Sequence, residues 1–387
     1  MAVKYDVAVA GLGAMGSAAA RQLAMRGAKV VAFDRFEPPH ALGSSHGATR
    51  VTRLAIGEGD HLTPLAVRSH ELWRELGAES GAALLNECGL LIVSSDANAA
   101  QTHVSGFFDN TVAAAGRFGI AHELLDAAQI RARWPMFRVR DGEHGYFENT
   151  GGFVRPEACV RAQLESARRH GAELRTNERV LGFDAGTHGV TVTTGKGSYA
   201  TERLIVAAGP WLPELLPPSL AALFKIYRQI QVWLEVEDAA AFAPQRFPVF
   251  IWELQNSTRG IYGFPALAGE HAIKLASEEF LSVTTPAAMD RDVHVEEIAA
   301  VQALATANIG GIGARCVRGA ACLYTVTRDF GFVIDRHPDS ERVIIASPCS
   351  GHGFKHSPAI GEALADMAVG RAPRFNLAPF AFARFAR

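Results

Sequence analysis

A glycine motif between two apolar segments opens the chain, and it constrains the fold more than any other feature of the sequence. The segment Tyr5–Ala10 is short, apolar and rich in valine, as buried parallel strands are. It is followed directly by GLGAMG at positions 11–16 and by an alanine-rich helical pattern over 17–26. A second apolar run at 29–33 ends at Asp34. This order predicts a βαβ unit that binds a dinucleotide.

Each glycine of the motif has a physical role in such a unit. Gly11 permits the tight turn, Gly13 lets the backbone approach a pyrophosphate, and Gly16 lets the helix pack closely on the strand. The helix N-terminus offers free N–H groups and the positive end of its dipole to the phosphates, and Asp34 can accept a hydrogen bond from a ribose hydroxyl. The residues predicted to bind the cofactor here are Gly11, Gly13, Ala14, Met15, Gly16, Asp34 and Arg35.

The chain after Asp34 does not continue as a nicotinamide-binding domain usually does. Residues 36–53 are rich in Gly, Ser, His and Pro, at the place where another strand and helix would be expected. The glycine motif alone does not separate FAD from NAD, but this interruption favours a flavoprotein over a nicotinamide enzyme.

Strand and helix patterns return in the middle and at the end of the chain. A buried-strand pattern spans 203–209, and another at 342–346 precedes a glycine-rich loop and a helical pattern over 359–369. We therefore expect an α/β fold in which a Rossmann-like FAD-binding domain is interleaved with a β-rich α+β substrate domain. The predicted FAD-binding domain comprises 1–85, 147–218 and 322–387, and the predicted substrate-binding domain comprises 86–146 and 219–321.

Three stretches lead to further expectations of element type. Residues 101–119 and 124–134 have helical patterns, and the second is expected to end near Pro135. Residues 152–156 are expected to form a turn-like joint before a helix over 157–170.

Composition and charge exclude several function classes. The 387 residues include 38 Lys and Arg against 40 Asp and Glu, a net charge of −2, which argues against a nucleic-acid partner. The 5 cysteines contain no CxxC pair, so neither a structural zinc site nor a disulfide framework is expected. No uncharged apolar run reaches the roughly 18 residues of a membrane span. With no secretory signal at the N-terminus, we expect a cytoplasmic protein without membrane contact.

Two other catalytic patterns receive little support. His352 and His356 are four residues apart, but no glutamate lies between them and no third ligand stands out, so no metal site is predicted. No GxSxG nucleophile elbow, in which the serine stands between a strand and a helix, and no Ser/His/Asp set is evident, which argues against a serine hydrolase.

Four sequence blocks together resemble one flavoenzyme family. The glycine motif with Asp34 is followed by SSHGATR at 44–50, CLYT at 322–325 and SGHGFK at 350–355, and a weaker YGFP block stands at 262–265. In this order the blocks resemble the monomeric sarcosine oxidase and N-methyltryptophan oxidase family, within the D-amino-acid-oxidase-like FAD-dependent amine oxidoreductases. The resemblance spans nearly the whole chain.

The resemblance implies how the cofactor is held. The cysteine of the CxYT block is joined to the flavin 8α-methyl carbon by a thioether in this family, and the matching residue is Cys322. Cys316 lies nearby and is expected to be inert. The other residues expected to contact FAD are Ser44, Ser45, His46, Thr49, Arg50, Gly209, Trp211, Gly351, His352, Gly353, Phe354 and Lys355.

The resemblance also implies roles in catalysis and substrate binding. Lys274 matches the lysine that activates dioxygen beside the flavin, where a fixed positive charge stabilises developing superoxide. Arg50 matches an arginine that tunes the flavin, and Tyr262 is expected to line the substrate pocket. Arg53 and Lys355 match the cations that hold the substrate carboxylate through charge-assisted hydrogen bonds.

One position departs from the family pattern. Sarcosine-oxidising members have a histidine four residues after the lysine that activates oxygen, and Glu278 stands there in this chain. A carboxylate in place of an imidazole changes the charge of the pocket, where it could repel a small anionic amino acid or attract a second amine. Glu278 therefore argues against sarcosine itself as the substrate.

The expected reaction is the oxidation of a secondary amine, such as an N-methyl amino acid. The imine product hydrolyses to an aldehyde and a primary amine, and O2 is reduced to H2O2. The expected partners are a small-molecule amine and O2, and the protein is expected to be a monomer. Three alternatives remain: an FAD-dependent amino-acid or imino-acid dehydrogenase that uses another electron acceptor, a non-catalytic flavin-binding protein, and an NAD-dependent dehydrogenase.

Overall fold

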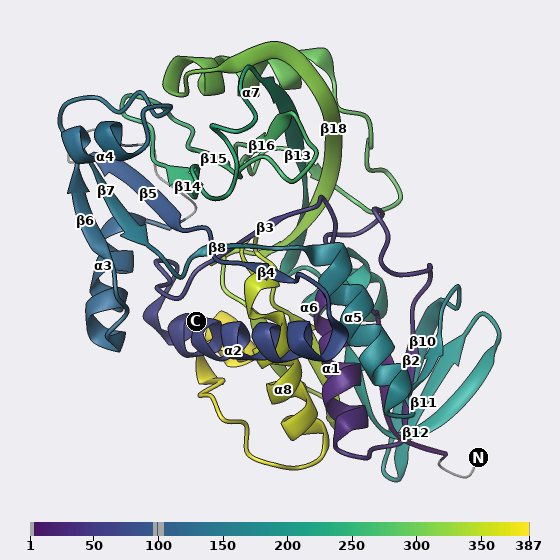
Figure 1. The fold of residues 1–387 in the computed structure, drawn as a ribbon. Coiled ribbons are helices and arrows are strands. Elements are labelled where there is room, and N and C mark those ends of the chain that lie inside the picture. Colours follow the sequence, from purple (N-terminus) through teal and green to yellow (C-terminus); the bar gives the residue numbers. More distant parts are fainter. Residues whose placement is uncertain (1–3, 96–98, 100–103, 387) are drawn as a thin grey trace.

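The computed structural model describes residues 4–95, 99 and 104–386, and two large β-sheets organise them (Figure 1). In the view of Figure 1 the glycine motif and its sheet occupy the lower part of the molecule, and the second sheet occupies the upper part. The α/β architecture agrees with the expectation from the sequence.

The lower sheet has eight strands and contains the predicted βαβ unit. β1 (Tyr5–Ala10) lies at its centre and pairs in parallel with β2 (Val30–Phe33) and β12 (Gly197–Val206). The remaining strands are β9 (Glu173–Arg175), β10 (Val180–Gly186), β11 (Gly189–Thr194), β19 (Val333–His337) and β20 (Ser340–Ser347). Because β12 and β20 also pair in parallel, the strands predicted at the start, middle and end of the chain meet in one sheet.

Helices cover this sheet, and a glycine in the first turn of α1 lets that helix lie close to β1. α1 (Ala14–Met25) packs against α5 (Pro156–Arg169) and α8 (Ser357–Ala368), and α2 (Thr63–Ser80) packs against α8. A side chain at Gly16 would collide with the carbonyl of Gly11, so only glycine lets α1 begin this close to β1.

The upper sheet has nine strands and an aromatic core. Its strands are β5 (Leu90–Ser95), β6 (Glu123–Asp126), β7 (Glu143–Glu148), β13 (Phe224–Val236), β14 (Val249–Trp252), β15 (Ile261–Gly263), β16 (Ala272–Ala276), β17 (Val283–Thr284) and β18 (Ile312–Thr327). Phe137 packs against Phe247, Phe250 and Trp252 within this core. Three helices accompany the sheet, α3 (Phe107–Phe118), α4 (Ala127–Arg133) and α7 (Val295–Asn308).

A small three-stranded sheet and short helices complete the chain. β8 (Gly152–Val154) pairs with β3 (Arg50–Thr52) and β4 (Leu85–Asn86), and Figure 1 shows these strands between the two larger sheets. The short helices are η1 (Asp60–Leu62), η2 (Gly209–Leu215), α6 (Pro218–Ala221), η3 (Phe354–His356), η4 (Ala378–Phe380) and η5 (Phe382–Ala386).

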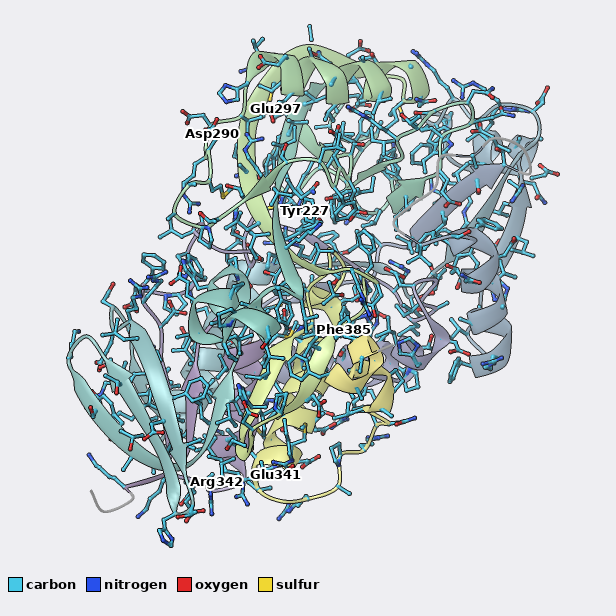
Figure 2. All side chains as sticks on the ribbon, turned by 180° about the vertical axis from the view of Figure 1, so that it is seen from behind. Tyr227, Asp290, Glu297, Glu341, Arg342 and Phe385 are labelled. Atoms are coloured by element: carbon cyan, nitrogen blue, oxygen red, sulfur yellow. The ribbon has the colours of Figure 1, made fainter. Side chains whose placement is uncertain are left out.

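Side chains on the far side of the molecule mark its two ends. Figure 2 shows Asp290 and Glu297 at the end that carries α7, with Glu341 and Arg342 at the opposite end. Glu297 accepts hydrogen bonds from Arg228 of β13, which ties α7 to the upper sheet.

Two expectations of element type are wrong, and a third is met only in part. Residues 123–126 form β6 and the helix begins only at Ala127, because Asp126 and Gln129 form a reciprocal capping box there. The expected joint at 152–156 contains β8, whose backbone is paired on both sides. Of the helix expected over 101–119, residues 101–103 lie outside the described residues, and α3 begins at Phe107.

The division into domains stays a prediction. β7 and β18 run across the predicted boundaries at 146/147 and 321/322, and both strands belong to the upper sheet. No described helix combines the length and the apolar composition that crossing a lipid bilayer requires.

Candidate active site

Two adjoining cavities lie where the glycine motif, the loop after Asp34 and the upper sheet meet. The larger encloses about 1300 Å³ and the smaller about 670 Å³, each partly open to solvent. Both are lined by Arg50, Tyr324, Gly351 and Phe354. A ligand that extends along the larger cavity therefore ends against the smaller one.

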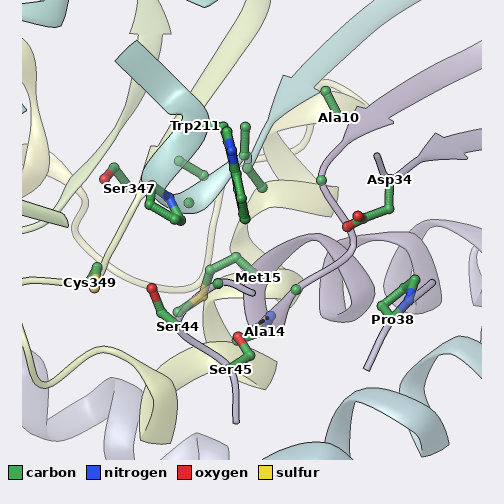
Figure 3. Close-up of a pocket in the computed structure, with 18 of the residues that line it drawn as sticks. Ala10, Ala14, Met15, Asp34, Pro38, Ser44, Ser45, Trp211, Ser347 and Cys349 are labelled. Carbon is green, nitrogen blue, oxygen red and sulfur yellow. Dashed lines mark hydrogen bonds between the residues drawn. The ribbon is translucent and has the colours of Figure 1, made fainter. Parts of the chain in front are cut away.

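The larger cavity begins at the glycine motif. Gly11 has a φ of +96°, and a side chain there would collide with the backbone of Ala207, so the turn requires glycine. The hydroxyl of Ser45 accepts a hydrogen bond from the backbone N–H of Ala14, 3.1 Å away, at the first turn of α1. The SSHGATR loop is thereby held against the helix N-terminus, as Figure 3 shows.

The carboxylate of Asp34 is fixed at one end of this cavity. It accepts hydrogen bonds from the backbone N–H groups of Leu12 (2.8 Å) and Phe36 (2.9 Å). Beside it, the guanidinium of Arg35 lies 5.3 Å from the ring centre of Trp211. Figure 3 shows Asp34 at one end of the pocket and Cys349 at the other.

Buried polar atoms along and behind the cavity point to a bound polar ligand. The buried side-chain atoms without a hydrogen-bond partner in the described part of the chain include Thr49 Oγ1, Ser347 Oγ, His46 Nε2 and Gln231 Oε1. Ser347 lines the cavity directly. Buried polar atoms are normally paired in native proteins. The volume of the cavity, the glycine turn and the unpaired hydroxyl of Ser347 at its wall together fit FAD.

His46 is buried beside the larger cavity without lining it, and its imidazole is neutral. Burial, assisted by the nearby charge of Arg50, lowers the pKa of the imidazole to about 4. At neutral pH the ring therefore adds no charge beside the cavity.

The smaller cavity contains a buried lysine supplied by β16. The ammonium of Lys274 donates hydrogen bonds to the carbonyl oxygens of Gly47 (2.9 Å) and Thr49 (2.6 Å), and it lies 4.4 Å from the ring centre of Phe264. Burial, with the nearby charge of Arg50, lowers the pKa of Lys274 well below its ordinary value. The two carbonyls hold the side chain at the wall of the cavity.

Arg53 and Lys355 both line this cavity, and both lie beside a carboxylate of the protein itself. Glu58 forms an ion pair with Arg53, and a Glu58 oxygen lies 3.7 Å from the Lys355 ammonium. All three side chains are at most 3% exposed. Burial lowers the pKa of Lys355 to about 8 although Glu58 acts in the opposite direction.

Glu278 faces the same cavity from the end of β16, together with Tyr262 and Tyr324. Burial raises the pKa values of both phenols, and the negative charge of Glu278 raises them further. Both phenols are therefore protonated at neutral pH and can donate hydrogen bonds.

Most of the predicted site residues line one of the two cavities, and four do not. Gly16, His46, Thr49 and Cys322 line neither. Cys322 is 1% exposed, and its sulfur accepts a hydrogen bond from the amide nitrogen of Gln231 at 3.2 Å. The residues that do line a cavity are Gly11, Gly13, Ala14, Met15, Asp34, Arg35, Ser44, Ser45, Arg50, Arg53, Gly209, Trp211, Tyr262, Lys274, Glu278, Gly351, His352, Gly353, Phe354 and Lys355.

Sequence reasoning missed several lining residues. Glu58 stands in a Gly-Glu-Gly-Asp stretch, where a carboxylate is usually solvated, and only the fold brings Lys355 to it. Tyr324 stands within the CLYT block, and this block could have indicated that the residue lies at the site. Cys349 lines the larger cavity and had no sequence signal of its own.

Comparison with known proteins gives a consistent result. The model of the FAD dependent oxidoreductase family matches residues 6–367. The monomeric sarcosine oxidase of Bacillus sp. (strain B-0618) is 36% identical over 372 residues, which cover 95% of this chain and 93% of that protein. The N-methyl-L-tryptophan oxidase of Yersinia pestis (strain Pestoides F) is 33% identical over 383 residues, covering 98% and 99%.

Solved structures agree on the fold. The open form of NikD, an unusual amino acid oxidase essential for nikkomycin biosynthesis, superposes with a TM-score of 0.82 at 23% identity and covers 98% of this chain and 97% of its own. The L-proline dehydrogenase from P. horikoshii gives a TM-score of 0.82 at 20% identity, covering 100% and 99%. The predicted family resemblance and the predicted two-domain FAD-binding fold are thereby confirmed.

Proposed function

This chain belongs to the family of FAD-dependent oxidoreductases, and we propose that it oxidises a small N-methyl amino acid at the carbon beside the nitrogen. The substrate would occupy the smaller cavity, at the junction with the FAD cavity. The observation that carries the proposal is the meeting of Arg53, Lys355, Tyr262 and Lys274 in that cavity. The names of the two relatives described above, sarcosine oxidase and N-methyl-L-tryptophan oxidase, support the same substrate class.

The substrate carboxylate is the group that these side chains orient. Arg53 and Lys355 would bind it by charge-assisted hydrogen bonds while they remain paired with Glu58. Tyr262 and Tyr324, held protonated, would donate hydrogen bonds at the opposite wall. These contacts would fix the amine and its neighbouring carbon at the junction of the two cavities, and fixed geometry of this kind accelerates a reaction.

FAD, when bound in the larger cavity, would accept a hydride equivalent from the substrate carbon and later pass two electrons to O2. The imine then hydrolyses in water to an aldehyde and a primary amine. Lys274 would supply positive charge where oxygen is reduced to H2O2, and its two carbonyl acceptors hold the ammonium in place. Arg50, which lines both cavities, would bring a second cation to the reacting end of the cofactor.

Three finer properties belong to this proposal. The flavin is joined covalently to Cys322, the pocket disfavours sarcosine and favours a substrate with a second amine because of the charge of Glu278, and the protein acts as a cytoplasmic monomer. Cys349 lines the larger cavity and is therefore the rival thiol for the covalent bond.

The experiment combines absorption spectra with substrate addition. The purified protein should absorb as oxidised flavin, an N-methyl amino acid should bleach it without oxygen, and air should restore the colour with release of H2O2. After acid precipitation the flavin should stay with the pellet, and it should be released from the Cys322→Ser variant but not from Cys349→Ser.

Other outcomes identify the alternatives. A bleached flavin that is restored by an artificial acceptor but not by air identifies a dehydrogenase. A flavin that no amine bleaches indicates a non-catalytic binder. A colourless protein that cannot be reconstituted with FAD would return the assignment to NAD.

A further inference from the structure

The amide of Gln231 lies beside the sulfur of Cys322. Gln231 is in β13 and is 2% exposed, and its nitrogen Nε2 donates a hydrogen bond to the Cys322 sulfur at 3.2 Å. The pairing of β13 with β18 places Gln229 opposite Cys322 and Gln231 opposite Ala320. Because side chains alternate along a strand, Gln229, Gln231 and Cys322 share one face of the sheet.

The backbone of Gly47 holds this amide in position. Gly47 has a φ of +102°, and a side chain there would collide with the oxygen of Gln231. The carbonyl of Gly47 accepts from Lys274, and its N–H donates to Glu157 at 2.6 Å. The Gln231 amide therefore packs between a fixed loop of the cofactor site and the sulfur.

The donor end of the amide suits every state of that sulfur in covalent attachment. A thiolate is the nucleophilic form of cysteine, and a hydrogen-bond donor stabilises it. A thioether sulfur has no proton, so it can only accept a hydrogen bond. The nitrogen of Gln231 can serve both forms, whereas its oxygen could serve neither.

We propose that Gln231 is a positioning residue for the covalent attachment of the flavin to Cys322, an inference that rests on the proposed function. In the attachment step the sulfur forms a bond to the 8α carbon, while the S–H bond and one C–H bond of the methyl group break. The two protons and two electrons released reduce the flavin ring, and O2 then reoxidises it and forms H2O2. Gln231 holds the sulfur in place and donates a hydrogen bond to it while the new bond forms.

The test is the rate of attachment in the full-length protein. Flavin-free protein, produced in riboflavin-depleted cells, is incubated with excess FAD in air, samples are precipitated with acid at intervals, and the flavin is measured in pellet and supernatant. Gln231→Met removes the donor at similar volume and should slow attachment on the order of tenfold, the effect of one hydrogen bond to a charged group. Gln231→Glu should slow it further, because a carboxylate repels a thiolate.

Two controls separate attachment from general structure. Gln229→Met changes a buried glutamine on the same face that bonds the backbone of Glu279, and it should leave the attachment rate unchanged. In a Cys322→Ser background, Gln231→Met should not change the affinity for non-covalent FAD. Thermal unfolding of each variant confirms that it is folded.

Three results would overturn the inference. Attachment of the Gln231→Met variant at the wild-type rate removes the role of the amide. If Gln231→Met lowers the affinity for non-covalent FAD in the Cys322→Ser background as much as it lowers the attachment rate, Gln231 shapes the FAD site and does not act on the sulfur. If the wild-type protein releases all of its flavin into acid, covalent attachment itself is refuted. This result concerns the proposed function and is seen in the wild type alone, so it can be told apart from a failure of the inference on Gln231.

Discussion

The Glu58 carboxylate lies 3.7 Å from the Lys355 ammonium, and both side chains are only 3% exposed. Arg53, equally buried, pairs with the same carboxylate. The site proposed for a substrate carboxylate therefore already contains one negative charge for two cations. Removing one member of a buried ion pair leaves uncompensated charge, which costs about 3–5 kcal/mol.

We expect Glu58→Gln to destabilise the protein and to increase its response to anions. The variant should lose about 3 kcal/mol of unfolding free energy, and a short-chain carboxylate such as propionate should raise its melting temperature more than that of the wild type, because the ligand replaces the missing charge. Thermal unfolding with and without propionate measures both effects.

The matched control is Glu362→Gln. Glu362 pairs with Arg68 at 2.9 Å and is 15% exposed, but it lines neither cavity. This variant should lose stability without a larger response to propionate. If both variants respond to propionate as the wild type does, Glu58 does not compete for the carboxylate site.

The lowered pKa of Lys355 predicts a pH dependence of substrate binding. Its pKa of about 8 means that the ammonium loses its proton as the pH rises through 8. The value of kcat/KM for a carboxylate substrate should therefore be highest below pH 8 and fall above it, by up to about tenfold per pH unit. Bound carboxylate favours the charged lysine, so kcat should fall at higher pH than kcat/KM.

Lys355→Arg is the diagnostic variant for this dependence, because an arginine stays charged throughout the range. Its kcat/KM should be flat from about pH 7 to about pH 9.5. An unchanged fall in the arginine variant would assign the titration to another group.

The sequence predicted the parts of the site that depend on short-range pattern. The glycine turn, α1 and Asp34 follow one another within 30 residues, and the geometry of a βαβ unit follows from that spacing. Glu58 could not be predicted as a partner of Lys355, because 297 positions separate them and the packing of β3 against η3 brings the two segments together. The start of α4 was missed because the capping residues Asp126 and Gln129 compete with a continuous helical pattern.

Pairing of distant strands explains the other omissions. β18 pairs with β13 over most of its length, from Phe224 opposite Thr327 to Val236 opposite Ile312. This pairing sets Gln231 beside Cys322, and neither residue carries a local signal for the contact. Register between strands so far apart in the chain depends on the packed sheet.

Lys274→Met should separate the two halves of the reaction. The wild-type ammonium is held by two backbone carbonyls at the wall of the substrate cavity, and methionine keeps the length without the charge. Reduction of the flavin by substrate should change only a few-fold, while reoxidation by O2 should slow by about 100-fold or more, as loss of a charge-stabilising group does. Rapid-mixing absorption spectroscopy, first without oxygen and then with it, measures each half.

Lys225→Met provides the control for this comparison, since Lys225 is an exposed lysine of β13. It should leave both rates unchanged. An equal loss of both rates in Lys274→Met would refute a specific role in oxygen reduction.

Glu278 should determine which amines the pocket prefers. A carboxylate at the wall of the cavity favours a substrate with a second cationic group and disfavours small neutral side chains. Glu278→Gln should lower kcat/KM for an N-methylated diamino acid by about tenfold relative to its uncharged isostere, a difference of one partly screened charge pair. If the substitution leaves the ratio of the two kcat/KM values unchanged, the side chain of the substrate does not approach Glu278.

His70 makes the fold sensitive to acid. It is 1% exposed, its Nε2 lies 2.7 Å from the hydroxyl of Thr52, and burial, with the charge of Arg74, lowers its pKa to about 3. The unfolded chain takes up a proton near pH 6.5, where the folded chain does not. Stability is therefore fully present above that pH and falls by about 1.4 kcal/mol per pH unit from this residue as the pH decreases toward 3.

His70→Gln should reduce this loss, because the side chain no longer titrates. The unfolding free energy is measured by urea denaturation at about pH 7 and at about pH 5. The loss of free energy between these two pH values should be smaller in the variant than in the wild type, by up to about 2 kcal/mol. His188→Gln, a change at an exposed histidine, should keep the wild-type difference. Burial also lowers the pKa values of His46, to about 4, and of His61 and His356, and all three remain in every variant. A difference that persists in full in His70→Gln would therefore assign the acid sensitivity to these histidines instead.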